Sequence, residues 1–457
     1  MDTDRLMVSV SGVRGTVGQT LTARTACDFG CAFATMLGAG KSVVVGRDTR
    51  LSGAMIRSAV AAGLMSCGVN VIDLGVVTTP GAALMASKLS ADGGVVITAS
   101  HNPSQYNGIK FLQPHGPGLT AQAAGRLKAI WEAGKFAFVD SAGQGQESRN
   151  TRTHAAHVDA VCRYVDVKGV ASKRFKVVLD SINGAGCVVS PMLLGELGCE
   201  LAHVNAQADG RFTHEPEPVK KNLSELCREV RRHKAAVGFA QDPDADRLVV
   251  VDERGEFIGE EYTLALTAAF VLRHRKGDLA TNLATSRMID DIAAAAGVRA
   301  LRCPTGEANV AQTMADHGCI FGGEGNGGVI EPRVVCVRDS LVGMAYILQY
   351  LAETGKTVSQ LVAEIPAYVM VKTKFACPAG AAATVVQNAR RAFADEPQAS
   401  FNDQDGLRVD LPAGWVSVRA SNTEPIMRIM AEARQAATAD ELVSRVRKIA
   451  DETIASL

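Results

Sequence analysis

In the first third of the chain, short apolar runs alternate with longer segments whose apolar positions recur at helical spacing. The apolar runs predict strands at 42–45, 69–74 and 94–97, and the segments 21–37 and 54–67 predict helices. Strands and helices that alternate at this length indicate a parallel α/β sheet. Ligands of such sheets bind at the loops that follow the carboxyl ends of the strands, so we expect the chemistry there.

The same alternation returns twice further along the chain. A second unit starts with a strand predicted at 176–180, and a third follows it. The last segment changes pattern, because its strands follow one another in antiparallel order with helices beside them, which indicates a small α+β domain. A polar linker is predicted at 143–152, where the first unit ends. We therefore expect four domains. They are residues 1–150, 151–254, 255–366 and 367–457.

Composition and charge argue against several classes of function. The chain has 457 residues, of which 47% are hydrophobic, so it is long enough for several globular cores. Lys and Arg (48) balance Asp and Glu (48), which argues against nucleic acid or an anionic membrane as the main partner. There is no C-x-x-C pair and no apolar run of ~18–20 residues, and the acidic residues in the first positions lead us to expect no signal peptide. We therefore expect a cytoplasmic monomer or weak homo-oligomer that acts on small molecules.

The first candidate site is the polar corner where the third of these strands ends. Ser100 stands at that corner before His101, and a turn predicted at Asn107-Gly108 leads into a second strand at 109–111. A serine at a strand end, on a loop stiffened by a proline, suits a nucleophile or a phosphate carrier. The alternative is a serine that only satisfies backbone groups of its own loop.

The second candidate site is D-P-D-A-D-R at 242–247. Its proline excludes a helix interior, so Asp242, Asp244 and Asp246 project to one side of an extended loop. Three crowded carboxylates need a cation, and their hard oxygen ligands favour Mg²⁺. The spacing also imitates a helix–loop–helix calcium loop, but Arg247 stands where that loop needs glycine and the flanks are predicted strands. Arg247 would instead suit a phosphate.

Two further loops carry polar groups that suit a sugar phosphate. R-A-S-N-T-E-P at 419–425, with Arg428 beyond it, offers guanidinium groups, hydroxyls and turn amides, which a phosphate monoester prefers. The flexible G-G-E-G-N-G-G at 322–328 presents Glu324 and Asn326, whose donors and acceptors suit sugar hydroxyls. The alternatives are an ordinary turn with a surface arginine and a glycine-rich hinge.

Basic residues near these loops are candidates for proton transfer or for clamping the transferred group. They are Arg14, in a glycine-rich loop after a short strand, together with Lys110 and His101. His154 and His157 lie one helical turn apart and could bind a metal, but no third ligand is near. A solvated helix face is the simpler interpretation of these two histidines.

Taken together, the four loops resemble the active-site loops of the α-D-phosphohexomutase superfamily, which includes phosphomannomutase/phosphoglucomutase and phosphoglucosamine mutase. The matching motifs are T-A-S-H-N-P at 98–103, D-P-D-A-D-R at 242–247, G-E-G-N-G-G at 323–328 and R-A-S-N-T-E-P at 419–425. The resemblance covers the whole chain. It implies three tandem α/β domains with mixed sheets and a C-terminal α+β domain of the TATA-binding-protein type, around a central cleft.

The resemblance also implies a role for each loop. Ser100 would carry a phosphate, and the three aspartates would bind one Mg²⁺ together with a phosphoserine oxygen. Hexose 6-phosphate and hexose 1-phosphate would interconvert through a sugar 1,6-bisphosphate, which turns round without being released and also serves as activator. The implied substrate-binding residues are Glu324, Asn326, Thr305, Gly306, Arg419, Ser421, Asn422, Thr423 and Arg428. The implied catalytic residues beside Ser100 are His101, Lys110, Arg14 and Arg247.

The sequence departs from the family's usual pattern at two histidines. Many relatives have G-E-x-S-G-H in the sugar loop and Gly-His in the third-domain loop, whereas this chain has Asn326, Gly328 and Gly306-Glu307 at those places. The G-E-G-N-G-G loop favours phosphoglucosamine mutase, with phosphomannomutase/phosphoglucomutase as the alternative. Two other classes stay open, a Mg²⁺-dependent sugar phosphatase and a non-catalytic protein that binds sugar phosphates.

Overall fold

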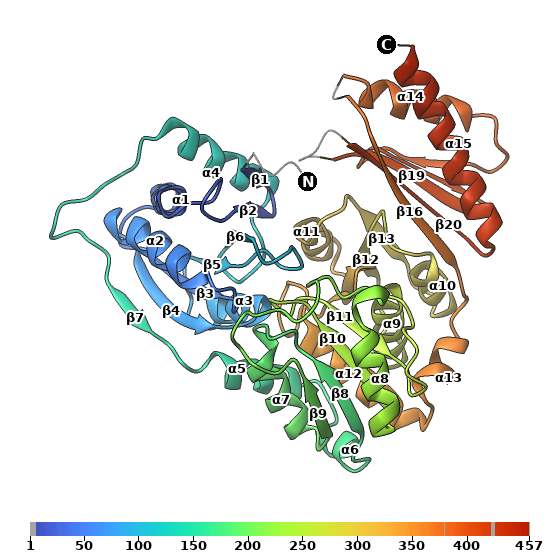
Figure 1. Cartoon of the computed structure of the whole chain (residues 1–457), viewed down its shortest axis with the longest axis horizontal. Coiled ribbons are helices and arrows are strands. Elements are labelled where there is room, and N and C mark those ends of the chain that lie inside the picture. Colours follow the sequence, from blue (N-terminus) through green and yellow to red (C-terminus); the bar gives the residue numbers. More distant parts are fainter. Residues whose placement is uncertain (1–5, 379, 422–425, 457) are drawn as a thin grey trace.

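The computed structural model describes residues 6–378, 380–421 and 426–456 (Figure 1). Within these residues the chain forms four separate sheets of seven, four, four and five strands, which follow one another along the sequence. The first three sheets are mixed and belong to α/β units, and the fourth is antiparallel and carries helices. The predicted fold class is therefore confirmed.

The first sheet positions the serine corner. Its strand order is β1 (Met7–Ser9), β2 (Gly12–Thr16), β6 (Tyr106–Leu112), β5 (Gly93–Ile97), β3 (Ser42–Arg47), β4 (Asn70–Val76) and β7 (Glu147–Arg149). Its helices are α1 (Ala23–Leu37), α2 (Gly53–Ser66), α3 (Thr79–Lys88) and α4 (Ala121–Ala133). The hydroxyls of Thr22 and Thr120 cap α1 and α4 by accepting from backbone N–H groups of the first turn. Since β6 returns antiparallel beside β5, Lys110 lies next to the strand that leads to Ser100.

Two local predictions in this domain are wrong. Asn107 and Gly108 form no turn but lie inside β6, where a Cβ on Gly108 would meet the carbonyl oxygen of Thr98 at 2.6 Å. This glycine therefore allows two backbones to approach closely and does not reverse the chain. Arg14 lies on β2 of a hairpin and not in a loop. The linker predicted at 143–152 contains the edge strand β7, which pairs with β4.

The second sheet positions the aspartate loop. Its strand order is β11 (Leu248–Val251), β10 (Val237–Gln241), β8 (Lys176–Asp180) and β9 (Glu200–Val204). Its helices are α5 (Thr153–Cys162), α6 (Val167–Ala171), α7 (Gly186–Glu196) and α8 (Ser224–His233), with a 3₁₀ turn η1 (Lys220–Asn222). Contrary to prediction, His157 is not solvated, because α5 packs against α3 and α12 (Ser340–Thr354). The ring is buried, with Nε2 at 2.7 Å from Asp339.

The third sheet shares its core with the first two domains. Its strand order is β13 (Ala300–Cys303), β12 (Leu279–Asn282), β14 (Phe321–Glu324) and β15 (Gly328–Ile330). Its other helices are α9 (Glu261–His274), α10 (Met288–Ala295), α11 (Glu307–His317) and α13 (Val358–Ala363). One cluster of buried apolar residues includes Val44, Val189 and Leu348, which come from domains I, II and III. These three domains are therefore packed around a continuous core.

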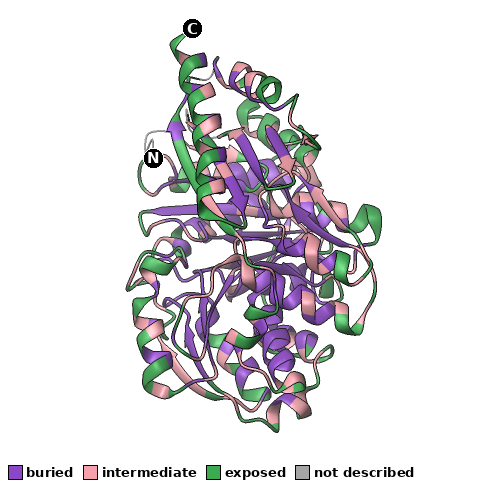
Figure 2. Cartoon of the chain, turned by 90° about the vertical axis from the view of Figure 1, so that its right-hand side faces the viewer, coloured by how far each residue is buried: buried purple, intermediate pink, exposed green. Residues whose placement is uncertain are grey.

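The fourth sheet has an apolar core of its own. Its strand order is β16 (Val369–Ala376), β20 (Ile426–Ala433), β19 (Gly414–Ala420), β18 (Leu407–Leu411) and β17 (Ser400–Asn402). Helices α14 (Ala382–Ala392) and α15 (Ala436–Ala455) pack on each other and on this sheet. Figure 2 shows buried residues along the sheets and exposed residues on the outer sides of the helices. Among the described helices, none is long and apolar enough to cross a membrane.

Candidate active site

Ser100 lies where the first two domains meet, after the carboxyl end of β5. The residue has a left-handed backbone with φ of 50°, a conformation that is strained for any residue with a side chain. Its Oγ donates a hydrogen bond to Oδ2 of Asp242 at 2.7 Å, although the two residues follow strands of different sheets. The structure therefore brings together the predicted serine and the predicted metal loop, which are 142 residues apart in sequence.

The three predicted aspartates converge beside this serine. Asp242, Asp244 and Asp246 are fully buried, and one carboxylate oxygen of each lies within 4.8 Å of the other two. The Oδ1 atoms of Asp244 and Asp246 are buried, and no residue in the described part of the chain hydrogen-bonds to them. Such oxygens are costly to bury unless a cation binds them. The residues present therefore fit a hard divalent cation such as Mg²⁺.

Two cationic side chains offset the charge of this cluster. Nζ of Lys110 lies 2.7 Å from Asp244 and 3.1 Å from Asp246, and Arg338 donates to Asp246 at 2.6 Å. Burial alone would raise the pKa of Asp246, but Arg338 and Lys110 outweigh burial and hold that pKa below its usual value. At Asp242, burial and the charges of Asp246 and Asp244 raise the pKa well above its usual value. A bound divalent cation would favour the ionised carboxylate there.

The two predicted proton-transfer candidates next to Ser100 differ in charge. Burial opposes the charge of Lys110, but the neighbouring carboxylates outweigh burial and raise its pKa above the usual value, so the ammonium is retained. Burial, with Arg247 and Arg14 nearby, lowers the pKa of His101 well below its usual value. Its imidazole is therefore neutral at neutral pH, with Nδ1 3.4 Å from Oγ of Ser100. Of the two groups, only the imidazole can accept a proton in this state.

The two predicted arginines lie around the same centre. Nη1 of Arg14 donates to Oδ1 of Asn102 at 2.9 Å, and burial lowers the pKa of Arg14. The backbone N–H of Arg247 donates to Oδ1 of Asp242 at 3.1 Å, and the buried Nε of Arg247 has no hydrogen-bond partner within the ranges that the structure describes. Guanidinium groups beside a serine and a cation site suit a phosphoryl group.

Arg338 is the main residue that the sequence-based prediction missed. It precedes α12, whose N-cap is Asp339, and it donates to Asp246 at 2.6 Å, Glu324 at 2.6 Å and Glu307 at 2.9 Å. Burial opposes its charge, but these carboxylates outweigh burial and raise its pKa well above the usual value. One guanidinium thus connects three of the candidate loops. The sequence feature that could have indicated this residue is an arginine that follows the apolar run 334–337 and directly precedes a helix cap.

The predicted sugar-binding residues of domain III meet at one place. Oε1 of Glu324 accepts from Nδ2 of Asn282 at 2.7 Å and from the backbone N–H of Gly306 at 3.1 Å. Oδ1 of Asn326 and Oγ1 of Thr305 are buried and have no hydrogen-bond partner among the described residues. Buried polar atoms of this kind are normally completed by a ligand or by water. The two loops therefore form a polar surface that suits sugar hydroxyls.

Arg419, the first residue of the predicted phosphate loop of domain IV, lies near this surface. Arg419 on β19 is opposite Arg428 on β20 in the register of the sheet. Nη1 of Arg419 lies 3.6 Å from Asp405, which also accepts from the backbone N–H of Thr305 at 3.1 Å. Asp405 thus connects the phosphate loop with the third-domain loop. Of the other predicted residues, Ser421 is half-buried, and Asn422 and Thr423 lie outside the described residues.

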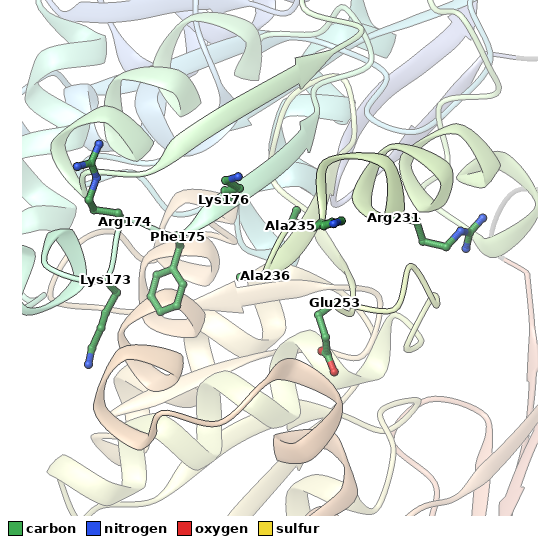
Figure 3. Close-up of a pocket in the computed structure, with 9 residues that line it drawn as sticks. Lys173, Arg174, Phe175, Lys176, Arg231, Ala235, Ala236 and Glu253 are labelled. Atoms are coloured by element: carbon green, nitrogen blue, oxygen red, sulfur yellow. The ribbon is translucent and has the colours of Figure 1, made fainter.

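Domain II also has a cationic hollow, which lies at the end of its sheet opposite the aspartate loop (Figure 3). Its cavity volume is about 490 Å³, and its lining includes Lys173, Arg174, Lys176 and Arg231. Lys176 is the first residue of β8, whereas Asp242 follows the last residue of the parallel strand β10. The side chains of Lys173, Arg174 and Arg231 point away from one another, so they do not form a common anion site.

Known proteins share this arrangement along the whole chain. The sequence profiles of phosphoglucomutase/phosphomannomutase alpha/beta/alpha domains I, II and III match residues 5–138, 155–255 and 259–368, and the C-terminal domain profile matches 370–449. A Thermococcus kodakarensis protein named phosphoglucomutase/phosphomannomutase is 40% identical over 97% of this chain and 98% of its own. A probable phosphoglucosamine mutase of Methanopyrus kandleri is 37% identical over the same shares. A phosphoglucomutase/phosphomannomutase family protein from Burkholderia thailandensis, 29% identical, superimposes with a TM-score of 0.86 over 98% of both chains.

Proposed function

The chain belongs to the phosphoglucomutase/phosphomannomutase family, and on that premise we propose that it is a phosphohexomutase, an isomerase that interconverts hexose 6-phosphate and hexose 1-phosphate. The observation that carries this proposal is the 2.7 Å hydrogen bond from Ser100 to Asp242, which joins a nucleophile to a cation site. A Mg²⁺-dependent phosphatase would use the aspartates but would leave the buried serine without a role.

Ser100 is the proposed carrier of the phosphate. A sugar hydroxyl attacks the phosphorus of the phosphoserine, the bond between phosphorus and Oγ breaks, and the hydroxyl proton passes to a base. The neutral imidazole of His101, 3.4 Å from Oγ, suits that base. After the bisphosphorylated sugar has turned round, Oγ attacks its other phosphate and the proton returns to the leaving sugar oxygen. The products are the isomeric monophosphate and the phosphoserine.

The remaining groups of the corner supply position and charge, which phosphoryl transfer needs most. We propose that Lys110, Arg14 and Arg247 clamp the transferred group, and the raised pKa of Lys110 supports a cation there and not a base. The three aspartates and a phosphoserine oxygen would hold Mg²⁺, which would offset the charge of that group when bound.

For the sugar, we propose glucosamine phosphate. Glu307 stands where many relatives have histidine, and its Oε2 accepts at 2.9 Å from Arg338, which also donates to the proposed sugar-binding residue Glu324. A carboxylate at this place can pair with the ammonium group of an amino sugar, which glucose and mannose lack. The relative named phosphoglucosamine mutase supports the same substrate. The 40% identical relative supports the alternative, phosphoglucomutase/phosphomannomutase.

The C-terminal loop is the proposed grip for the phosphate that does not react. Two guanidinium groups on neighbouring strands can take a phosphate in bidentate fashion, with hydroxyl and amide donors completing the site. The residues proposed for it are Arg419, Ser421, Asn422, Thr423 and Arg428. Thr305 and Gly306 are proposed to contact the substrate from domain III.

We also propose the four-domain division at residues 1–150, 151–254, 255–366 and 367–457. The zero net charge supports small sugar phosphates as partners, in preference to nucleic acid. Unpaired cysteines at all eleven positions support a reducing, cytoplasmic location. A monomer or weak homo-oligomer is the proposed assembly state.

The test compares the wild type with Ser100→Ala on glucosamine, glucose and mannose phosphates, each with its 1,6-bisphosphate as activator. The proposal expects isomerisation by the wild type, fastest with glucosamine phosphate, and none by Ser100→Ala. Isomerisation by the variant would contradict a phosphoserine mechanism. Release of inorganic phosphate without isomerisation would favour the phosphatase, and binding without turnover would favour a non-catalytic binding protein. A preference for mannose or glucose phosphate would keep the mutase and replace the substrate.

A further inference from the structure

The left-handed backbone of Ser100 is held from both sides by hydrogen bonds. Its N–H donates to Oγ1 of Thr98 at 2.8 Å, and its carbonyl oxygen accepts from Nη2 of Arg50 at 2.7 Å. A strained conformation at φ of 50° persists only where the surroundings fix it. Part of that support comes from the turn at 48–50, between β3 and α2, which the proposed reaction does not otherwise use.

Arg50 uses all five guanidinium N–H groups on acceptors around it. The side chain is buried, with 1% of its surface exposed. Its Nε donates to Asp48 at 3.2 Å. Its Nη1 and Nη2 atoms donate, at 2.5–2.9 Å, to the backbone carbonyl oxygens of Ser100, Asn102, Pro103 and Tyr106. The whole loop from residue 100 to 106 is therefore wrapped around one cation.

Asp48 forms a buried ion pair with this arginine, so the pair carries no net charge. Its Oδ2 accepts from Oγ1 of Thr98 at 2.6 Å, and its Oδ1 accepts from the backbone N–H of Arg50 at 2.9 Å. A chain of hydrogen bonds thus leads from Arg50 through Asp48 and Thr98 to the N–H of Ser100. A buried network whose members are all bonded holds its geometry tightly.

The same turn also contacts the support of the metal loop. Oγ1 of Thr49 donates to the carbonyl oxygen of Asn183 at 2.8 Å. Two residues further on, the N–H of Ala185 donates to the carbonyl oxygen of Pro243 at 2.8 Å, inside the aspartate loop. The ring of Phe212, also from domain II, lies 5.1 Å from the Arg50 guanidinium. The turn is therefore joined to the nucleophile loop on one side and to the metal loop on the other.

We propose that Arg50 is a positioning residue, which binds four carbonyl groups of the Ser100 loop and so fixes Oγ of Ser100 against the metal loop. The proposal rests on the proposed function in one respect, that Ser100 carries the phosphate. A lysine cannot do the same, because its ammonium has three donors at one point in place of five in a planar fork. Arg50 therefore affects phosphoryl transfer. It does not affect sugar binding, which is proposed to take place on domains III and IV.

The test uses Arg50→Lys, Arg50→Ala and the matched control Arg57→Ala. Arg57 lies on α2 in the same domain, is 15% exposed and pairs with Asp73 at 3.2 Å. It has no part in the proposed reaction. Arg50→Lys should lower kcat by about 100-fold with little change in KM, as expected when a reacting atom is misplaced by about 1 Å. Arg50→Ala should lose more and regain part of its kcat with sub-denaturing guanidinium, but not with urea. Arg57→Ala should keep the wild-type kcat.

Amide hydrogen exchange provides a second readout that needs no turnover. Exchange of the peptide covering 98–106 should rise in both Arg50 variants and stay at the wild-type rate in Arg57→Ala, while the peptides of domain IV stay unchanged in all variants. Wild-type kcat and exchange in Arg50→Lys would overturn the proposal, and so would an equal loss in Arg57→Ala. If the wild type isomerised no hexose phosphate, the proposed function would fail, while the exchange result would still decide whether Arg50 orders the Ser100 loop.

Discussion

Two regions of the molecule are built in different ways. One is the catalytic corner, which contains Ser100, the aspartate loop at 242–247 and Lys110, and the other is the C-terminal domain. The corner joins its domains through buried charges, such as Lys110 with Asp244, and the apolar cluster around it continues through domains I to III. Domain IV has its own apolar cluster and meets domain III through polar contacts, which include the partly exposed pair of Arg287 with Asp410 at 2.9 Å and the buried Arg408, whose Nη1 donates to the carbonyl oxygen of Leu283. The two regions therefore differ in how firmly their functional groups are fixed to one another.

This difference matches two demands of the proposed reaction. The attacking and leaving atoms must be held in a fixed geometry, which buried and fully paired groups provide. The phosphate grip must accept either end of the turned-round sugar, and a separately packed domain suits that task. Substitutions in the corner should therefore lower kcat, whereas substitutions in the phosphate loop should raise KM.

The largest effect is expected at the aspartates. Asp242→Asn keeps the size of the side chain but removes one charged ligand and one of the two oxygens that accept from Ser100 and from the N–H of Arg247, so kcat should fall by about 1,000-fold. Chelation of Mg²⁺ should abolish turnover in the wild type. The control is Asp451→Asn in domain IV, which removes an exposed ion pair with Arg447 and should keep kcat within about threefold. Steady-state kinetics would contradict the comparison if both variants lost kcat equally.

Substitution of Arg338 should lower both the free energy of unfolding and turnover. Arg338→Met leaves Asp246, Glu324 and Glu307 without their shared guanidinium, so the free energy of unfolding should fall by on the order of 3 kcal/mol. Turnover should fall by about 100-fold, since three loops lose their common anchor. Denaturant unfolding measures the first effect. The control, Arg299→Met, removes an arginine that is 73% exposed and should leave the unfolding midpoint unchanged. An unchanged midpoint in Arg338→Met would contradict the structural role.

A smaller effect on turnover is expected in the phosphate loop. Arg419→Ala removes one guanidinium from the proposed grip, so KM for the hexose phosphate should rise by about 10-fold with little change in kcat. Initial-rate kinetics separate the two parameters. A loss confined to kcat would place Arg419 among the groups that act on the transferred phosphate and would remove the distinction between the two regions.

The smallest effect on turnover is expected at Glu261, where domain III meets β16 of domain IV. Burial raises the pKa of Glu261 to about 8, although Lys372 opposes the shift. A carboxyl whose pKa is raised in the folded state contributes stability below its unfolded pKa and loses it as pH rises through the folded pKa. Between pH 4.5 and pH 8, the wild type should therefore lose on the order of 4 kcal/mol relative to Glu261→Gln. Denaturant unfolding across this range measures the loss, and parallel pH profiles would contradict it.

The site residues that could be predicted stand in loops directly after apolar strands. Ser100 and the three aspartates combine a residue type and a spacing that indicate chemistry without knowledge of the fold. Arg338 and Arg50 could not be found in this way, because their roles arise from contacts with residues far along the chain. Arg338, for example, pairs with Asp246 across 92 residues.

Fold class was more predictable than local turns for a related reason. The alternation of strands and helices is a property of neighbouring residues, so it can be read along the chain. At Asn107-Gly108 the same local reasoning fails, because the space between two backbones selects the glycine and Nδ2 of Asn107 donates to Oγ of Ser52 at 2.9 Å. The joining of the first three domains into one core likewise depends on contacts that no local pattern contains.

The central claim is that Ser100 carries the phosphate, and it can be tested on the protein itself. The wild type would be incubated with Mg²⁺ and glucosamine 1,6-bisphosphate, digested, and mapped by mass spectrometry. The claim predicts one phosphate on Ser100, lost when excess hexose monophosphate is added and absent in Ser100→Ala. Isomerisation with no phosphate on Ser100, or with the phosphate on Asp242 or Asp244, would contradict it.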